Sequence, residues 1–413
     1  MTAVNSNVHE LAVPRTYVSP LDTVDEIVGR HYPALRSSVH AMLSIFATMA
    51  IMGRTKPLSL IFETPSGYGK TATLQMAFPI RDDSPIAELM YRSDKFTPRS
   101  FVSHAANAKK EDMPKLDMLP KLENKVLITK ELAPILRGRV EELQENFSIL
   151  ISVLDGKGFV SDSGMHGRRG YERPILFNWV GATTPLPAAT HRLMSQLGTR
   201  LLFFEVPARP PTIDELKAYL RNSDPDAAER ECQKVVNEFL IEFFKNKPVA
   251  SIDESEFKFV EELQEQLIRW VSFLVSARAE IRFEDEQPIA ALPTEGPRKV
   301  VNYFKQLAFG HALIHGRQEV DDTDIAFIGE VALSSTPGHL RNIIRALRTM
   351  PTVDTALATK LCQVSRPTAR KYLIELQVLG LVTLTKGESD SFVVTLADEY
   401  DWLRTYPESK VSV

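Results

Sequence analysis

The sequence predicts an α/β fold in which a parallel sheet is flanked by helices, and three stretches carry this prediction. Residues 58–73, LSLIFETPSGYGKTAT, have the pattern of a buried strand, a glycine-containing loop and the start of a helix. Residues 125–129 and 175–180, KVLIT and ILFNWV, have the composition of two further buried strands. Helical patterns at 23–53 and 140–154, and a strand pattern at 86–91, complete the expected core.

The loop after the first strand has the composition of a phosphate-binding loop. Glycines let backbone N–H groups approach polyphosphate, Lys70 would reach the β and γ phosphates, and the Thr71 hydroxyl would hold Mg²⁺. The pattern GxxxxGK[ST] has one departure, because Thr64 stands at the first glycine position. The alternative is an incidental glycine turn. We expect ATP and Mg²⁺ as ligands, bound by Pro65, Ser66, Gly67, Tyr68, Gly69, Lys70, Thr71 and Ala72.

Composition limits the classes of protein that remain. The 413 residues suffice for two or three domains, and 44% hydrophobic and 25% charged residues are typical of a globular protein. A net charge of −4 gives no global attraction to nucleic acid or membrane, so DNA contact would require a local basic patch. Cys232 and Cys362 lack metal-type spacing, and no apolar run reaches membrane-spanning length. We therefore expect a cytoplasmic protein with no membrane contact.

The strand at 125–129 leads into a second nucleotide motif. An Asp would hold the Mg²⁺ shell there and the next Glu would polarise the attacking water. Glu131 is present, but Lys130 occupies the Asp position and cannot coordinate a cation. Either Glu131 covers both tasks, Thr129 helps through a water, or hydrolysis is weak. A different interpretation makes Glu131 only a carboxylate at a helix N-terminus.

Residues 156–170 contain five glycines and predict a β-hairpin with a basic tip of His166, Arg168 and Arg169. Two arginines on a projecting hairpin could touch a phosphate backbone, or they could pair with surface carboxylates.

After the strand at 175–180, Thr184 is expected to hydrogen-bond the γ-phosphate or the attacking water, with Thr183 as second candidate. Arg200 stands at a turn, where it could reach a neighbouring subunit's nucleotide or pair within its own subunit.

In order and spacing, these motifs resemble an AAA+ ATPase domain. The likeness is greatest to the branch with a β-hairpin before the sensor-1 strand, which includes MCM replicative helicases and MoxR-type ATPases. The resemblance implies that Thr184 is sensor 1 and that Arg200 is an arginine finger, because GTRLLFF is similar to the SRF-type turn of MCM proteins. A finger needs a neighbour, so a ring or arc is implied, with a hexamer as the expected size.

The rest of the chain divides into an insertion, a lid and a terminal module. Residues 209–293 have helical spacing and no evident chemistry, whereas 294–339 are similar to the AAA+ lid, with Pro297 in a first helical turn and a second helix capped by Asp321 or Asp322. The resemblance implies that Arg298 contacts the γ-phosphate as sensor 2; alternatively it tethers a helix to a carboxylate. The expected divisions are an arm (1–22), the ATPase core (23–208), the insertion, the lid and a terminal module (340–413).

Residues 340–413 resemble a winged helix-turn-helix domain. A short helix at 355–361 and a second one after the cap candidate Ser365 precede two strand patterns joined by KGESD. In such domains the second helix enters the major groove, although winged helices also dock proteins. The expected DNA contacts are Arg366, Thr368, Arg370, Lys371 and, on the wing, Lys386.

The combined interpretation is an ATP-hydrolysing oligomeric motor that acts on DNA in replication, mobile-element maintenance or defence. Its catalytic residues would be Glu131, Thr184, Arg200 and Arg298. One alternative is an ATP-dependent switch or scaffold with weak hydrolysis, which Thr64 and Lys130 favour. Another is a transcription regulator whose winged helix finds a site while the ATPase controls oligomerisation.

Overall fold

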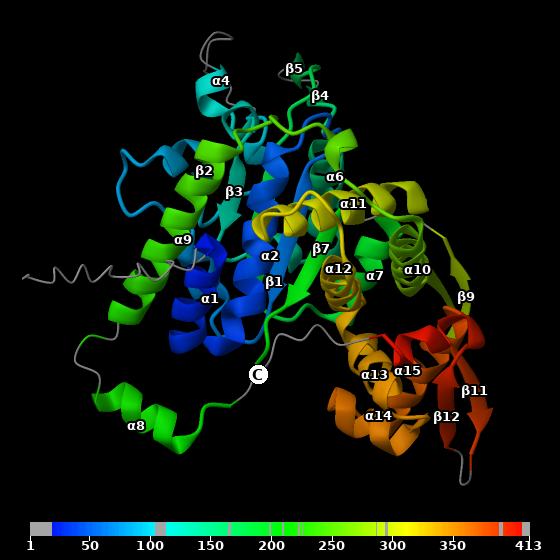
Figure 1. Ribbon diagram of the computed structural model, residues 1–413. Helices are drawn as coiled ribbons and strands as arrows, with labels where there is room; N and C mark the ends of the chain where they lie inside the picture. The colour runs from blue at the N-terminus through cyan, green and yellow to red at the C-terminus, as the bar shows by residue number, and fades with distance from the viewer. Residues whose placement is uncertain are drawn as a thin grey trace, which may run out of the picture.

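A parallel five-stranded sheet forms the centre of the molecule (Figure 1). The computed structural model describes residues 19–103, 113–163, 167–197, 200–208, 210–221, 224, 226–285, 287–293, 296–387 and 391–406. The strand order is β2-β3-β6-β1-β7, and all four pairings are parallel. The strands are β1 (Leu58–Glu63), β2 (Met90–Arg92), β3 (Val126–Thr129), β6 (Asn178–Thr183) and β7 (Leu201–Glu205). The predicted α/β class is therefore confirmed, and the core is consistent with a P-loop nucleotide-binding fold.

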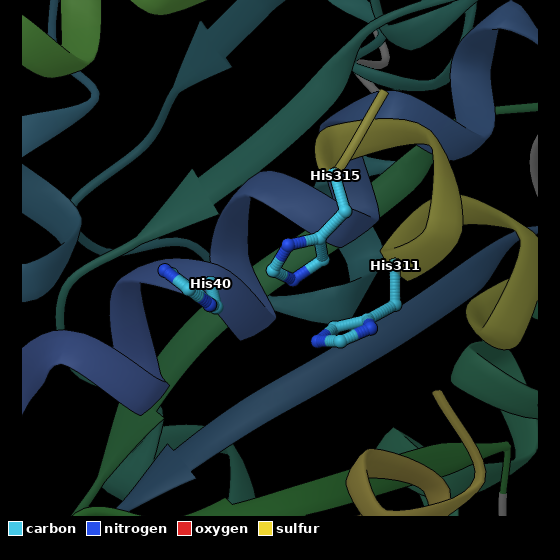
Figure 2. Close-up of side chains that lie close together, drawn as sticks. All are labelled: His40, His311 and His315. Atoms are coloured by element: carbon cyan, nitrogen blue, oxygen red, sulfur yellow. The ribbon is translucent and has the colours of Figure 1, made fainter. Parts of the chain in front are cut away.

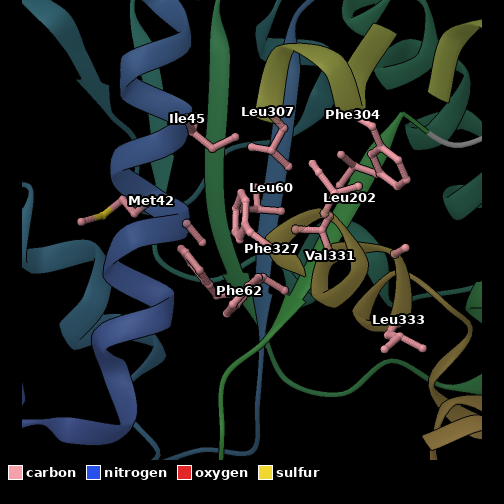
Figure 3. Packing of buried hydrophobic residues seen from close by; sticks show 14 of the residues in the cluster. Met42, Ile45, Leu60, Phe62, Leu202, Phe304, Leu307, Phe327, Val331 and Leu333 are labelled. Atoms are coloured by element: carbon pink, nitrogen blue, oxygen red, sulfur yellow. The ribbon is translucent and has the colours of Figure 1, made fainter. Parts of the chain in front are cut away.

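Both faces of the sheet are covered by helices. Leu60 and Phe62 of β1 belong to one apolar cluster, whereas Ile61 belongs to another, because successive side chains of a strand point to opposite faces. On the first face α2 (Arg36–Ala47) packs along α11 (Pro297–Ile314), where His40 lies near His311 (Figure 2). Figure 3 shows α2, β1, β7, α11 and α12 (Asp322–Ser334) meeting in that cluster. The second face is covered by α5 (Ala133–Leu136), α6 (Val140–Leu154) and α7 (Ala188–Leu197).

Three predicted boundaries differ from the structure. The helical pattern at 23–53 is divided at Pro33 into α1 (Pro20–His31) and α2, because proline cannot donate the backbone hydrogen bond that a continuous helix needs. Residues 85–89 form a 3₁₀ turn that starts at Pro85, so β2 is shorter than expected. The strand predicted at 175–180 begins at Asn178, whose side-chain oxygen accepts the Leu58 N–H at 3.3 Å. In contrast, α6 has the predicted bounds.

The hairpin predicted after α6 is present as β4 (Phe159–Ser163) and β5 (Gly167–Tyr171). His166, assigned to its tip, lies outside the described residues. The predicted helical insertion contains α8 (Ile213–Arg221), α9 (Ala227–Asn246) and α10 (Glu261–Ala277), but it ends in a second hairpin of β8 (Glu280–Glu284) and β9 (Gln287–Leu292). That hairpin was not predicted, and its turn uses Asp285 with a φ of 46°.

The helix caps predicted near the C-terminus are present. Pro297 opens α11, the Asp321 carboxylate caps α12, and the Ser365 hydroxyl accepts the Thr368 N–H. The remaining elements are α3 (Lys70–Met76), α4 (Met113–Leu116), α13 (Gly338–Thr349), β10 (Val353–Asp354), α14 (Thr355–Cys362), α15 (Arg366–Val378), β11 (Val382–Lys386) and β12 (Phe392–Leu396). β10, β12 and β11 pair as an antiparallel sheet beside α14 and α15. Among the described helices, none has both the length and the apolar character needed to cross a bilayer.

Candidate nucleotide site

The loop between β1 and α3 has the backbone conformation that its glycines predict. Gly67 and Gly69 have φ values of 90° and 86°, in the left-handed region that favours glycine. A Cβ atom on Gly69 would also lie 2.8 Å from the Cδ atoms of Leu35, which precedes α2. Of the expected loop residues, Pro65, Ser66 and Gly67 are exposed, whereas Tyr68, Gly69, Thr71 and Ala72 are half-buried.

Lys70 begins α3 with a charge that no described residue balances. The residue is 6% exposed, and within the described part of the chain its ammonium group has no recorded hydrogen bond or ion pair. The Thr64 hydroxyl nearby is buried and also lacks a partner. A cation beside the N-terminus of a helix, without a carboxylate partner, is suited to bind polyphosphate. The residues present therefore fit ATP, with the Thr71 hydroxyl positioned at the first turn of α3 for Mg²⁺.

The strand register brings the other predicted nucleotide residues to the same edge of the sheet. Glu63 of β1 pairs with Thr183 of β6, and the Thr64 N–H donates to the Thr183 carbonyl at 3.3 Å. Thr184 follows directly and is half-buried, whereas Thr183 is fully buried and its hydroxyl donates to the Thr184 carbonyl at 3.1 Å. Thr184 is thus the better placed of the two candidates. β3 ends at this edge as well, two residues before Glu131.

Glu131 makes the local contact that its alternative interpretation describes. Its Oε1 accepts the Ala133 N–H at 3.0 Å, where α5 begins. Lys130 is directed elsewhere, with its Nζ 3.6 Å from Asp94 Oδ2. The Thr129 hydroxyl is buried on the other face, where it accepts the Trp179 indole N–H at 3.2 Å. The contribution of Thr129 through a water is therefore not supported by its position.

Arg200 and Arg298 lie at the opposite edge of the sheet, where β1 and β7 begin. The Arg200 carbonyl accepts the Ser59 hydroxyl at 2.7 Å, and its guanidinium, in a residue 8% exposed, is 3.2 Å from Asp155. Lys299, next to the exposed Arg298, is 3.7 Å from the same carboxylate. The structure brings neither arginine to the phosphate loop of its own chain. The sensor-2 contact implied for Arg298 is therefore not formed within the chain, because α11 begins at the wrong edge.

A buried arginine that the sequence interpretation missed lies at the nucleotide edge instead. Arg341 of α13 is 3% exposed; its Nη2 donates to Glu63, and its Nη1 is 3.4 Å from Glu205 at the end of β7. Burial alone would lower the pKa of Arg341, but the Glu63 and Glu205 carboxylates outweigh it and raise that pKa. The sequence feature that could have indicated such an arginine is Glu63, because a carboxylate at the end of a buried strand is stabilised by a buried cation.

The two hairpin arginines differ in exposure. Arg168 is exposed and its Nη2 is 2.6 Å from Glu172, as expected for the surface alternative, and Arg169 is half-buried. These residues remain candidates for DNA contact in a protein whose net charge is negative.

The five C-terminal DNA candidates differ in exposure and in the residues that they contact. Arg366 and Lys386 are exposed at the start of α15 and the end of β11. The Thr368 and Ser365 hydroxyls are 2.8 Å apart. The Arg370 guanidinium lies 4.7 Å from the Phe392 ring, and the Lys371 ammonium 5.1 Å from the Phe283 ring of β8.

One face of α15 is docked on the core. Glu375 is fully buried and accepts hydrogen bonds from Arg192 of α7 at 2.6 Å and from His339 of α13, whose ring nitrogen is 2.9 Å away. The helix also packs against β9. The predicted DNA-reading helix is therefore partly covered within the molecule, while its N-terminal turn stays exposed.

Comparisons with known proteins give similarity to solved structures alone. No protein-family model matches the chain, and no curated protein matches it. A full-length MCM homolog from Methanopyrus kandleri is similar over 80% of this chain, with 12% identity and a TM-score of 0.40. An active helicase, SCCmec type IV Cch, is similar over 92% (10% identity, TM-score 0.34), and the apo C-terminal region of NrS-1 over 93% (11%, 0.26). The chain spans 63%, 71% and 78% of these three chains respectively.

Proposed function

We propose that this protein is an AAA+ ATPase that binds Mg·ATP at the β1–α3 loop and works as an oligomeric motor on DNA. The observation that carries the proposal is Lys70, a residue 6% exposed whose ammonium group has no hydrogen-bond or ion-pair partner among the described residues, at a helix start that follows two left-handed glycines. Backbone N–H groups of the loop and Lys70 would hold the phosphates. Thr71 would hold Mg²⁺, which would neutralise charge on the phosphates.

The other proposed catalytic residues lie at two opposite edges of the sheet. Glu131 would release the Ala133 N–H and orient the attacking water, and Thr184 would position it. Arg200 would come from the adjacent subunit, which requires that it leave Asp155. Arg298, exposed at the same edge, is a second cation that a neighbour would meet. Arg366 and Lys386 would contact DNA phosphates.

Nucleotide binding is tested with a fluorescent ATP analogue in the presence of Mg²⁺. Lys70→Ala removes one charge-assisted interaction worth about 1.5–3 kcal/mol, so affinity should fall about 10- to 150-fold. Lys95→Ala, at an exposed position, is the matched control and should bind like wild type. Equal affinity in wild type and Lys70→Ala would contradict the proposal.

Hydrolysis is tested by phosphate release with and without DNA. Glu131→Gln should retain ATP binding and lose turnover, whereas the control Glu88→Gln, at an exposed residue, should leave the rate unchanged. Wild-type turnover that DNA does not stimulate would exclude the motor.

A second candidate, a nucleotide-dependent switch or scaffold with weak hydrolysis, is favoured by one observation. Glu131 caps α5, and Lys130 stands where a magnesium-binding Asp would be. Tight ATP binding together with negligible turnover in wild type, with or without DNA, would establish the switch in place of the motor.

DNA binding by the full chain is tested on random and selected duplexes across salt concentrations. Arg366→Ala should weaken binding uniformly and reduce the salt slope by about one. The control Arg81→Ala, an exposed residue paired with Asp83, should leave both unchanged. Strong preference for one sequence that Arg366→Ala abolishes would instead support a transcription regulator.

A further inference from the structure

Three histidines from α2 and the C-terminal end of α11 meet beside the sheet. His40 of α2 faces His311 of α11 and His315, the residue that follows this helix, in Figure 2. The ring centroids of His40 and His315 are 5.4 Å apart, and those of His311 and His315 are 4.7 Å apart. Each ring offers one nitrogen, and these nitrogens all lie within 4.8 Å of one another. The cluster therefore offers three nitrogen donors converging on one small volume.

Two of the rings are oriented by carboxylates from neighbouring helices. Asp25 Oδ1 of α1 is 2.7 Å from His40 Nε2, and Asp324 Oδ1 of α12 is 2.6 Å from His311 Nδ1. A carboxylate on one nitrogen fixes the ring and its tautomer and leaves the other nitrogen to bind a metal ion, as is usual for metal-ligating histidine. Carboxylate-oriented rings point to a metal site more specifically than three histidine rings in contact would.

The charged groups beside the cluster pair with one another. The arginines nearby are engaged with the carboxylates, since Arg36 lies 3.5 Å from Asp25 and Arg317 2.8 Å from Asp324.

We propose that His40, His311 and His315 bind one divalent transition-metal ion of the zinc class. Three neutral nitrogens suit Zn²⁺ better than Mg²⁺ or Ca²⁺, which prefer oxygen. Ligand nitrogens about 2.1 Å from a tetrahedral ion lie about 3.4 Å apart, so a modest rotation of the rings closes the site. His315 is exposed, which leaves the fourth position to water.

The ion would join α2 to α11 close to the phosphate loop. Leu35, immediately before α2, is the residue that crowds Gly69, and His40 is five residues further along. The site is separate from the Mg·ATP site, because its residues are distinct from the loop residues. Its proposed task is to hold α2 against the C-terminal end of α11.

The test uses the full chain, purified without a histidine tag and freed of metal by a chelator. Wild type should take up one Zn²⁺ per chain by mass spectrometry, and Co²⁺ should give the visible band of a tetrahedral nitrogen site. His315→Ala, at an exposed residue, should abolish both signals while circular dichroism stays unchanged. The control His31→Ala, whose ring pairs with Glu231 outside the cluster, should retain both. Absence of Zn²⁺ and Co²⁺ binding in wild type, or equal loss in the control, would overturn the proposal.

A second variant tests whether Asp25 orients His40 for metal binding, and a separate measurement tests ATP binding. Asp25→Asn keeps the three ligands but weakens the orientation of His40, so Zn²⁺ affinity should fall about 10- to 100-fold. Affinity for the fluorescent ATP analogue should persist in zinc-free wild type, because the loop residues remain. Unchanged Zn²⁺ affinity in Asp25→Asn would contradict the assigned role of that carboxylate.

Discussion

Arg341 lies where β1 and β7 end, and its position explains how a carboxylate can directly precede the phosphate loop. Glu63 is 3% exposed; its Oε1 accepts the Leu186 N–H at 3.1 Å, and its Oε2 accepts from Arg341. The charge of Glu63 is thereby satisfied by the fold, which prevents it from competing with phosphate for Lys70. A buried pair of this kind is costly to break from one side, because the remaining charge stays buried.

Arg341→Met is therefore expected to lower the free energy of unfolding by about 3–5 kcal/mol. Arg81→Met, which removes one partner of an ion pair whose side chains are 76% and 70% exposed, should cost less than about 1 kcal/mol. Urea denaturation of both variants measures the difference. A similar small loss in both would show that Glu63 finds another partner.

At the scale of residues, the features that could be predicted from sequence are those that neighbouring residues determine. The φ values of Gly67 and Gly69 and the start of α3 at Lys70 follow from a dozen consecutive residues. Arg341 could not be assigned in this way, because it meets Glu63 across 278 positions of sequence. The carboxylate contact of Glu131 was foreseen only as an alternative.

At the scale of elements, prolines and a short run of alternating apolar and polar residues account for the helix and strand boundaries that differ from those expected. Pro33 and Pro85 each redirect the chain, and both were visible in the sequence. The β8–β9 hairpin has the period-two pattern of Ile281 and Phe283, but this short pattern directly follows the helical spacing of α9 and α10 and is hard to separate from it. Its Phe283 contacts Arg192 and Lys371, so it helps to hold α15 against the core.

The docking of α15 should depend on pH through Glu375. Burial raises the pKa of this carboxyl, but hydrogen bonds from His339 and Arg192 outweigh it and hold the pKa below the ordinary 4.5. Because the pKa is lower in the folded state, the stabilisation is present above about pH 4.5 and is lost as pH falls through the folded pKa.

Unfolding free energies measured from about pH 7 to about pH 3.5 should therefore fall more steeply for wild type than for Glu375→Gln. The variant lacks the titrating group, whereas the depressed pKa values of Asp25 and Asp324 affect both proteins alike. The control Glu88→Gln, at an exposed residue, should follow wild type. Parallel curves for wild type and Glu375→Gln would contradict this coupling.

At the scale of the whole molecule, the two edges of the sheet carry different parts of the proposed chemistry. Lys70, Glu131 and Thr184 lie at one edge, and Arg200 with Arg298 at the other. Under the proposed mechanism a neighbouring subunit would supply the arginines, and this is the physical basis for the proposed ring or arc.

Mixing two variants tests that division. Lys70→Ala should bind ATP more weakly than wild type, and Arg200→Lys retains a charge for Asp155 but cannot form a two-pronged contact with phosphate. Each alone should be nearly inactive, and a mixture should recover part of the ATPase rate, because some interfaces combine an intact loop with an intact Arg200. No recovery in mixed oligomers, whose formation is checked by sedimentation, would place the action of Arg200 within its own chain.

The attachment of α13 also bears on how such a protein can be divided or recombined. The expected division at residue 340 falls inside this helix, whose Arg341 neutralises Glu63. A fragment ending before the helix would keep the loop yet bury an acid without its cation. A fragment that runs through Thr349 would keep the pair intact, and residues 350–352, which lead to β10, offer the point of exchange. Grafting a different C-terminal module at that point should preserve nucleotide binding, so the proposed ATPase would acquire new targets without redesign of its core.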